Sequence, residues 1–271
     1  MKLGCTIPLS LLCDAVLPPD LAALAPKDDR QALLISLYTH GVRSIELHGI
    51  DRHTDPAALR QAVTVCENHG FSVTLHGTLI QDEPPSVFFA PYRALFTPSQ
   101  PCYTVTLHGL SEADTTCKQL CALSAYAESE RLSVAFVLEN DHKDSLQNAA
   151  DHCGGVWEIV SGTDNIGICW DMGHYYHNVL CGYEAGDLPS DPFLQRVRHT
   201  HIHAVGNGEM HLPFSQGELP LKRYLEALRT VRFDGVLNVE LSPARFYRNG
   251  NAFEAYLSAV DTLRNTVERV R

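Results

Sequence analysis

NIGICWDMGH, residues 165–174, is a short apolar run that ends in polar residues, Asp171 and His174. Similar runs lie on either side of it in the chain: SVAFVLEN from Ser133 ends in Glu139 and Asn140, and VRHTHIHAV follows from Val197. Short, nearly continuous apolar runs of this kind are typical of strands in a parallel sheet that is covered by helices. The middle of the chain therefore predicts three buried parallel strands with polar carboxyl ends.

The same pattern extends over the whole chain. Five further runs are LGCTIPL from Leu3, SIELHG from Ser44, SVTLHG from Ser72, YTVTLHG from Tyr103 and GVLNVELS from Gly235. Segments of helical period separate them, such as DDRQALLISLYTHG, PAALRQAVTVCENHG and LPLKRYLEALRTVRFDG, and most end in the glycine expected just past a helix. Eight strands alternating with helices in 271 residues predict an α/β fold, a single parallel eight-stranded (β/α)₈ TIM barrel domain spanning residues 1–271.

Composition narrows the class of protein. Lys and Arg number 21 against 32 Asp and Glu, a net charge of −11, which disfavours a nucleic-acid or anionic-membrane partner. The N-terminal apolar stretch is broken by Pro8 and followed by Asp14, so we expect neither a signal peptide nor a membrane span. Nine cysteines without a C-x-x-C pair indicate reduced thiols and a soluble, cytoplasmic protein.

Residues of the types that commonly bind metals, Glu, Asp and His, occupy the carboxyl ends of seven consecutive predicted strands. In chain order they are Glu46 and His48, His76, His108, Glu139, Asp171 with His174, the three histidines His199, His201 and His203, and Glu240. Because the carboxyl ends of barrel strands share one face, we expect these side chains to meet there. Crowded carboxylates and imidazoles repel one another unless a cation joins them. Ligands of mixed nitrogen and oxygen type favour Zn²⁺ or Mn²⁺, with Co²⁺ or Fe²⁺ as alternatives, and we expect no organic cofactor.

These residues give the chain a resemblance to the xylose isomerase-like TIM barrel superfamily, which groups sugar isomerases and epimerases with AP endonuclease family 2. The motifs that carry the resemblance are LEN at Glu139, WDMGH from Asp171 to His174, HIH at His201 and VEL at Glu240. In the isomerase branch, the resemblance implies one divalent metal held by Glu139, Asp171, His201 and Glu240. His201 is chosen among its neighbours because it registers best with the family's H-x-x-D pattern, although the Asp of that pattern falls at Ala204 here.

A second segment, GNGEMHLPFSQGELP, resembles the family's D-x-H-x-x-P-G-x-G stretch, with Ser215 where glycine is usual. In the endonuclease branch, this acid and histidine help to hold further zinc ions. The matching positions here are His76, His108, His174, Glu209 and His211, so a binuclear or trinuclear site stays open. Acidic mouth loops argue against a nucleic-acid substrate because they would repel phosphates; their residues are Asp82, Glu83, Asp141 and Asp144.

Two activities follow as alternatives. In a metal-dependent isomerase or epimerase of sugars, sugar phosphates or polyols, Glu139 and Glu240 would be the catalytic acid–base pair that forms an enediolate. His174 would then bind a substrate oxygen, and Arg245 a carboxylate or phosphate tail. The alternative is zinc-dependent hydrolysis of a phosphodiester, as in AP endonucleases. Phe88, Phe89 and Tyr92 are either a sugar-binding wall or a satellite core cluster, and a homo-oligomer is compatible with the sequence.

Overall fold

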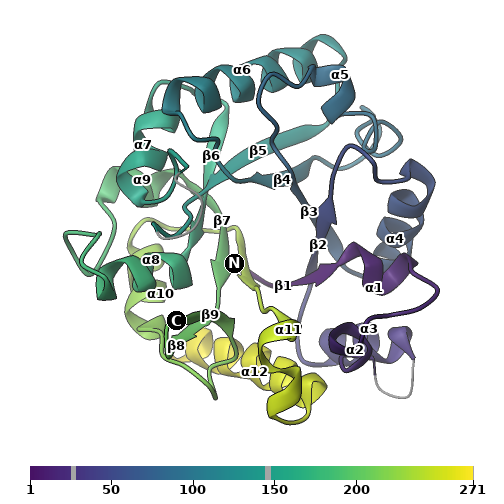
Figure 1. The fold of residues 1–271 in the computed structure, drawn as a ribbon, viewed down its shortest axis with the longest axis vertical. Helices are drawn as coiled ribbons and strands as arrows, with labels where there is room; N and C mark the ends of the chain where they lie inside the picture. The colour runs from purple at the N-terminus through teal and green to yellow at the C-terminus, as the bar shows by residue number, and fades with distance from the viewer. Residues whose placement is uncertain (26–28, 144–147, 271) are drawn as a thin grey trace.

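The computed structural model describes residues 1–25, 29–143 and 148–270, and its central feature is a closed barrel of parallel strands (Figure 1). Each barrel strand pairs with the next barrel strand along the chain, so that β7 pairs with β10, and β10 closes the barrel against β1. The strands are β1 (Lys2–Pro8), β2 (Ser44–Ile50), β3 (Ser72–Gly77), β4 (Tyr103–Leu107), β5 (Val134–Glu139), β6 (Ile166–Asp171), β7 (Val197–Ile202) and β10 (Val236–Val239). The predicted TIM barrel is confirmed, and its eight strands are the eight runs read from the sequence.

Helices surround the strands as an outer ring (Figure 1). They are α1 (Leu9–Cys13), α2 (Pro19–Ala22), α3 (Arg30–Thr39), α4 (Pro56–Asn68), α5 (Pro85–Phe88), α6 (Ala113–Ser129), α7 (Cys153–Ser161), α8 (Met172–Leu180), α9 (Asp191–Arg196), α10 (Leu221–Thr230), α11 (Pro243–Phe246) and α12 (Ala252–Val270), with a 3₁₀ turn η2 (Tyr247–Asn249). Helix α3 begins where the Asp29 carboxylate accepts hydrogen bonds from two backbone amides. Gly41 and Gly70 follow α3 and α4 with positive φ angles, as the sequence predicted for residues just past a helix. None of the described helices combines the length and the apolar character that a membrane crossing requires.

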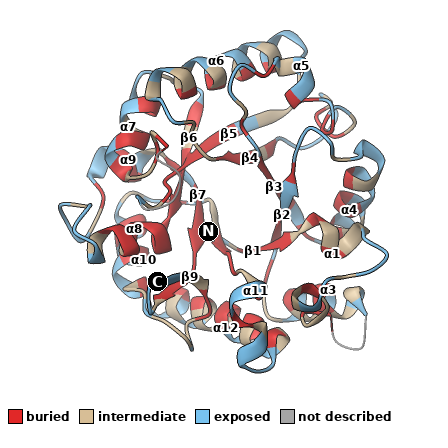
Figure 2. Cartoon of the chain, in the orientation of Figure 1, coloured by how far each residue is buried: buried red, intermediate tan, exposed pale blue. Residues whose placement is uncertain are grey.

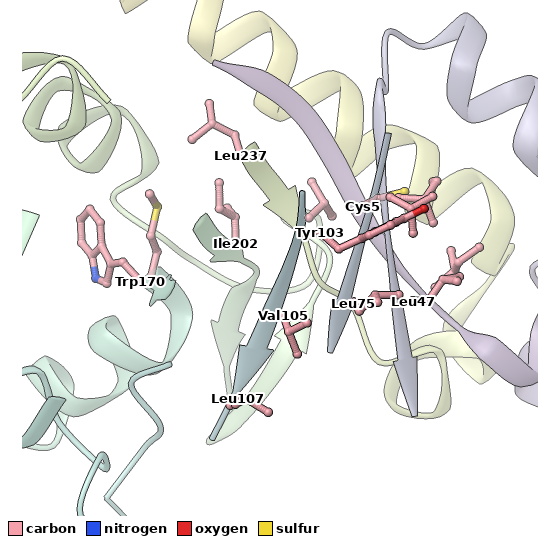
Figure 3. Close-up of a cluster of buried hydrophobic side chains, with 14 of the residues drawn as sticks. Cys5, Leu47, Leu75, Tyr103, Val105, Leu107, Trp170, Ile202 and Leu237 are labelled. Carbon is pink, nitrogen blue, oxygen red and sulfur yellow. The ribbon is translucent and has the colours of Figure 1, made fainter. Parts of the chain in front are cut away.

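The apolar core lies between the strands and the helices. Burial follows the barrel strands and the inward faces of the helices (Figure 2). Leu47, Leu75, Val105 and Ile202 belong to this core, part of which is drawn in Figure 3. Because side chains alternate along a strand, the residues next to these point the other way, into the barrel.

The interior of the barrel is polar near its carboxyl end. Glu46 on β2 is fully buried there, within 3.4 Å of the hydroxyls of Thr6 and Thr74 on β1 and β3. Its carboxylate also reaches His201 on β7, across the barrel. This polar layer lies directly beneath the strand ends that carry the candidate site residues.

A small antiparallel hairpin, β8 (Ala204–Gly206) and β9 (Glu209–Leu212), follows β7 outside the barrel. Its two-residue turn is Asn207-Gly208, and both residues have positive φ angles, as a type I′ turn requires. The hairpin brings His211 back over the barrel mouth, where its imidazole lies 3.2 Å from that of His174. The sequence analysis did not predict these two strands.

Candidate metal centre

Three carboxylates from neighbouring parts of the barrel meet at one ring nitrogen of His201. We call Glu139, Asp171, His201 and Glu240 the central group. The Nδ1 atom of His201 lies 2.9 Å from Glu139 Oε1, 3.2 Å from Glu240 Oε2 and 3.9 Å from Asp171 Oδ2. Glu139 and Asp171 end β5 and β6, His201 lies on β7, and Glu240 directly follows β10. The structure therefore brings together the whole ligand set that the resemblance implied.

Two carboxylate oxygens of the central group have no hydrogen-bond partner within the described part of the chain: Asp171 Oδ2 and Glu240 Oε2. Both atoms are buried, and both face His201 Nδ1. Leaving a buried carboxylate oxygen unpaired is costly, and a divalent cation would satisfy both at once. The donor set of three carboxylates and one imidazole fits Zn²⁺ or Mn²⁺.

The charges of the central group depend on one another. Burial alone would raise the pKa of Glu139, but the neighbouring His201 and His108 hold that pKa well below its usual value. In the same way, burial would raise the pKa of Glu240, but its attraction to His201 outweighs burial and keeps that pKa below its usual value. Burial would lower the pKa of His201, yet Cys169 and the surrounding carboxylates raise that pKa well above the ordinary histidine value. The carboxylates around His201 therefore favour positive charge at this point, which a bound cation would also supply.

The WDMGH segment is shaped to hold Asp171. Its carboxylate caps α8 by accepting a hydrogen bond from the backbone amide of His174 at 2.7 Å, while its backbone exchanges two hydrogen bonds of 2.9 Å with the side chain of Asn140. The ring of His203 packs against Gly173, where an added Cβ would lie 2.0 Å from a ring atom, and its Nε2 lies 3.1 Å from Asp171 Oδ1. Only glycine leaves room for that ring.

His76 and His108, which we call the histidine pair, contact the second carboxylate oxygen of Glu139, and the His76 ring stacks on the His201 ring with 5.6 Å between the ring centroids. Their Nε2 atoms lie 3.1 Å and 3.6 Å from Glu139 Oε2. His108 also faces Asp141, with 3.4 Å between its Nδ1 and Asp141 Oδ2. Burial works against a charge on His108, but Glu139 and Asp141 raise its pKa to about 9. His76, His108 and Glu139 together have the spacing of a second potential metal site.

The remaining candidate ligands divide into two sets. His174 and His211 come together with His203 in a third group of potential ligand atoms, with 3.2 Å between the Nε2 atoms of the first two. Glu209 does not join them: its side chain is exposed and lines a separate cavity of about 540 Å³ with Asn207. His203, and not Glu209 as the resemblance implied, is the third member of this group.

A cavity of about 420 Å³ opens beside the central group. Glu240, His211 and Arg245 line it, together with Asp20 from α2. Arg245 is exposed and donates a hydrogen bond to the Met210 carbonyl at 3.0 Å. The structure thus places Arg245 at the rim, next to a candidate catalytic glutamate.

The structure also bears on two other interpretations of the sequence, the aromatic residues after the third strand and the acidic residues at the mouth. Phe88, Phe89 and Tyr92 are buried in an aromatic cluster with Phe96 and Phe136, as a satellite core cluster would be. Asp141 does not present an exposed charge at the mouth, because His108 and His142 pair with it and it is 7% exposed. Asp144 lies outside the described residues.

Sequence reasoning underrated two residues on the interior of the barrel, Glu46 and His199. In the sequence, Glu46 was one of several strand-end residues of metal-binding type, and His199 was a neighbour of the chosen His201. In the structure, Glu46 lies 2.8 Å from His201 Nε2 and 2.7 Å from His199 Nε2. Alternation along β7 was the signal that could have found this contact, since it sends both histidines to the same interior face.

Comparison with known proteins agrees with the fold. Residues 102–266 match the family model described as Xylose isomerase-like TIM barrel. An uncharacterized protein of Methanocaldococcus jannaschii, MJ1188, is 32% identical over 56 residues, which are 21% of this chain and 21% of that protein.

Two solved structures extend the similarity over the whole length. A D-tagatose 3-epimerase-like protein superposes with a TM-score of 0.62 and 18% identity, covering 100% of this chain and 98% of its own. D-psicose 3-epimerase with D-tagatose from Clostridium cellulolyticum H10 gives a TM-score of 0.60 and 12% identity over 98% and 99%. At these identities the two structures show the shared fold, and the family match shows the membership: the chain belongs to the xylose isomerase-like TIM barrel family.

Proposed function

We propose that the protein is a metal-dependent isomerase or epimerase of a small sugar or polyol, in which Glu139 and Glu240 exchange the substrate proton. The observation that carries the proposal is that both glutamates contact the same atom, His201 Nδ1, from strands β5 and β10, which are not neighbours in the barrel. Two carboxylates on either side of one point can remove a proton from a carbon and return it from the other side.

A divalent cation held by the central group would act as a Lewis acid that stabilises negative charge on the substrate oxygens. The chain itself supplies the proton transfer and the orientation. Glu240 lines the cavity and has an unpaired oxygen, so it can accept a proton from substrate bound there. Glu139 is 1% exposed and is held in place by His201 and His76, at 2.9 Å and 3.1 Å.

The cavity supports a small substrate. A volume of about 420 Å³ suits a monosaccharide or polyol, and polar groups from Asp20, His48 and Ser242 line it as partners for hydroxyl groups. Arg245 at the rim would bind an anionic end of the substrate, and His174 would reach a substrate oxygen next to His211. Both epimerase-type neighbours are named for sugars, which agrees with this substrate class.

A second candidate function is zinc-dependent hydrolysis of a phosphodiester. The spacing of His76 and His108 around Glu139 favours it, because a second cation there would share Glu139 with the central group. Against it stands Glu209, the acid expected to hold a third zinc ion, whose side chain is exposed in another cavity.

Two assays run in parallel distinguish the two candidate functions. Metal-loaded protein is incubated with ketoses and inososes in deuterated water, and in parallel with a duplex that carries one abasic site, at low salt where phosphate binding is strongest. We expect deuterium to enter the carbon next to a carbonyl in at least one sugar, and the duplex to stay intact.

Variants connect either activity to the site. Glu240→Gln should abolish deuterium exchange, whereas Glu226→Gln, a matched change on the exposed face of α10, should leave it unchanged. Strand scission that Glu139→Gln abolishes, without deuterium in any sugar, would replace our proposal with the second candidate.

A further inference from the structure

We propose that Glu46 is a positioning residue of the metal centre: it accepts the Nε2 proton of His201 and so leaves the Nδ1 lone pair facing Glu139, Asp171 and Glu240. The inference rests on the proposed function, since it assigns a role toward the cation that the central group would hold. It concerns a residue that lies beneath the strand ends, inside the barrel.

The surroundings of Glu46 show that its carboxylate is an acceptor. Thr6, Thr74 and Thr106 place hydroxyl oxygens 3.3 to 3.4 Å from its two oxygens. The Thr6 hydroxyl already accepts a hydrogen bond of 2.6 Å from Asn238 Nδ2, so its own hydrogen is free to point at Glu46. Hydroxyl donors on both oxygens match an ionised carboxylate, which has no proton to give.

His201 therefore has to supply the proton of its contact with Glu46. Its Nε2 lies 2.8 Å from Glu46 Oε1, and both side chains are 0% exposed, so water cannot replace either partner. An imidazole that donates from Nε2 in its neutral form has its lone pair on Nδ1. That is the nitrogen that meets the other three members of the central group, and a carboxylate behind a ligating histidine is the usual way to fix such a tautomer.

The second oxygen of Glu46 anchors the carboxylate. Oε2 lies 2.7 Å from His199 Nε2 and is within reach of the Thr74 and Thr106 hydroxyls. With one oxygen held by hydroxyl groups of β3 and β4 and flanked by His199 of β7, the other stays aimed at His201. The polar layer thus connects the interior of the barrel to a single ligand at its mouth.

The test measures metal binding and the tautomer, without any substrate. Zn²⁺ affinity is measured by competition with a chromophoric chelator, and the ring tautomer of His201 by ¹H–¹⁵N spectroscopy of ¹⁵N-histidine-labelled, Zn²⁺-loaded protein, with the His201→Asn variant assigning its signal. In the unmodified protein we expect the proton of His201 on Nε2. Glu46→Gln should lower the Zn²⁺ affinity by about 10- to 100-fold, the usual effect of removing such a partner, and weaken or shift the Nε2–H signal.

Two further variants separate this role from a general effect on the fold. Thr106→Val changes the same buried layer but leaves the Oε1–His201 contact in place, so its affinity should fall by much less than that of Glu46→Gln. In a His201→Asn background, Glu46→Gln should cause no further loss, because Glu46 acts only through His201. If Glu46→Gln does not fold, Glu46→Asp, which keeps the charge but shortens the reach, takes its place with the same expected direction.

Several results would overturn the inference. They are an unchanged Zn²⁺ affinity in Glu46→Gln, a proton on Nδ1 of His201 in the loaded protein, an equal loss in Thr106→Val, or losses that add up in the double variant. A chain that binds no divalent metal at all would instead contradict the proposed function, so the two failures are distinguishable.

Discussion

The central group contains Glu139 and the histidine pair contacts it, but the histidines of the two sets are held in different ways. His201 is 0% exposed, and each of its ring nitrogens faces a buried carboxylate. The side chain of His108 is 39% exposed, and its Nδ1 forms no well-directed hydrogen bond to any described residue. The comparison teaches that similar proximity to a carboxylate can come with different support: the buried layer around Glu46 orients His201, whereas His108 is partly exposed.

The largest effect should come from the shared acid–base chemistry of the central group. Glu139→Gln and Glu240→Gln each remove a carboxylate that can accept a proton, so we expect turnover to fall by about 10³-fold. Each variant should remain folded, because both residues lie at the catalytic face and not in the apolar core. Turnover on the sugar panel is measured beside thermal unfolding; normal turnover in either variant would rule out that residue as acid or base.

Metal removal is the next test of the difference between the central group and the histidine pair. A cation that binds only the folded protein stabilises it by about 2.7 kcal/mol when its concentration is a hundred times the dissociation constant. We therefore expect a chelator to lower the thermal midpoint of the native protein. Asp171→Asn should abolish most of this response, since it removes a carboxylate oxygen that faces His201 Nδ1. A chelator response of native size in this variant would argue that the cation binds elsewhere.

A smaller effect concerns pH and the histidine pair. The folded protein raises the pKa of His108 from 6.5 to about 9, so its protonated form stabilises the fold fully below pH 6.5 and the contribution is lost as the pH rises toward 9. We expect the thermal midpoint of metal-free protein to decline over this range, and His108→Gln to flatten the decline. Partial exposure of His108 keeps the effect modest. An identical slope in both proteins would show that His108 is not charged.

Variants of the histidine pair should leave the metal content of the protein unchanged, which is the smallest of the expected effects. If one cation binds at the central group, His76→Ala and His108→Ala should each retain close to one metal per chain by mass spectrometry. A native content of two or three that falls in either variant would make the pair a second metal site and shift the preference to hydrolysis.

The strand pattern and the residues at the strand ends predicted the barrel and the face on which the polar side chains meet, and the family resemblance then selected the four residues of the central group. Parallel strands leave no choice of face, so Asp171 and Glu240 had to arrive at the same mouth once their runs were recognised as strands. The link between Glu46 and His201 spans 155 positions in the chain and depends on which residues meet across the barrel, which local periodicity does not encode. The outward turn of Glu209 depends on the β8–β9 hairpin, whose short strands left only a turn signal in the sequence.

Gly173 carries an evolutionary constraint that follows from its contact with His203. Because any side chain at 173 would occupy the volume of that imidazole, position 173 can accept a larger residue only where position 203 has lost its ring. Among relatives of this chain, we expect a residue larger than glycine at 173 to occur with a smaller side chain at 203. Such pairs would mark a lineage in which Asp171 is supported by some other neighbour, and so a branch point in how this family builds its centre.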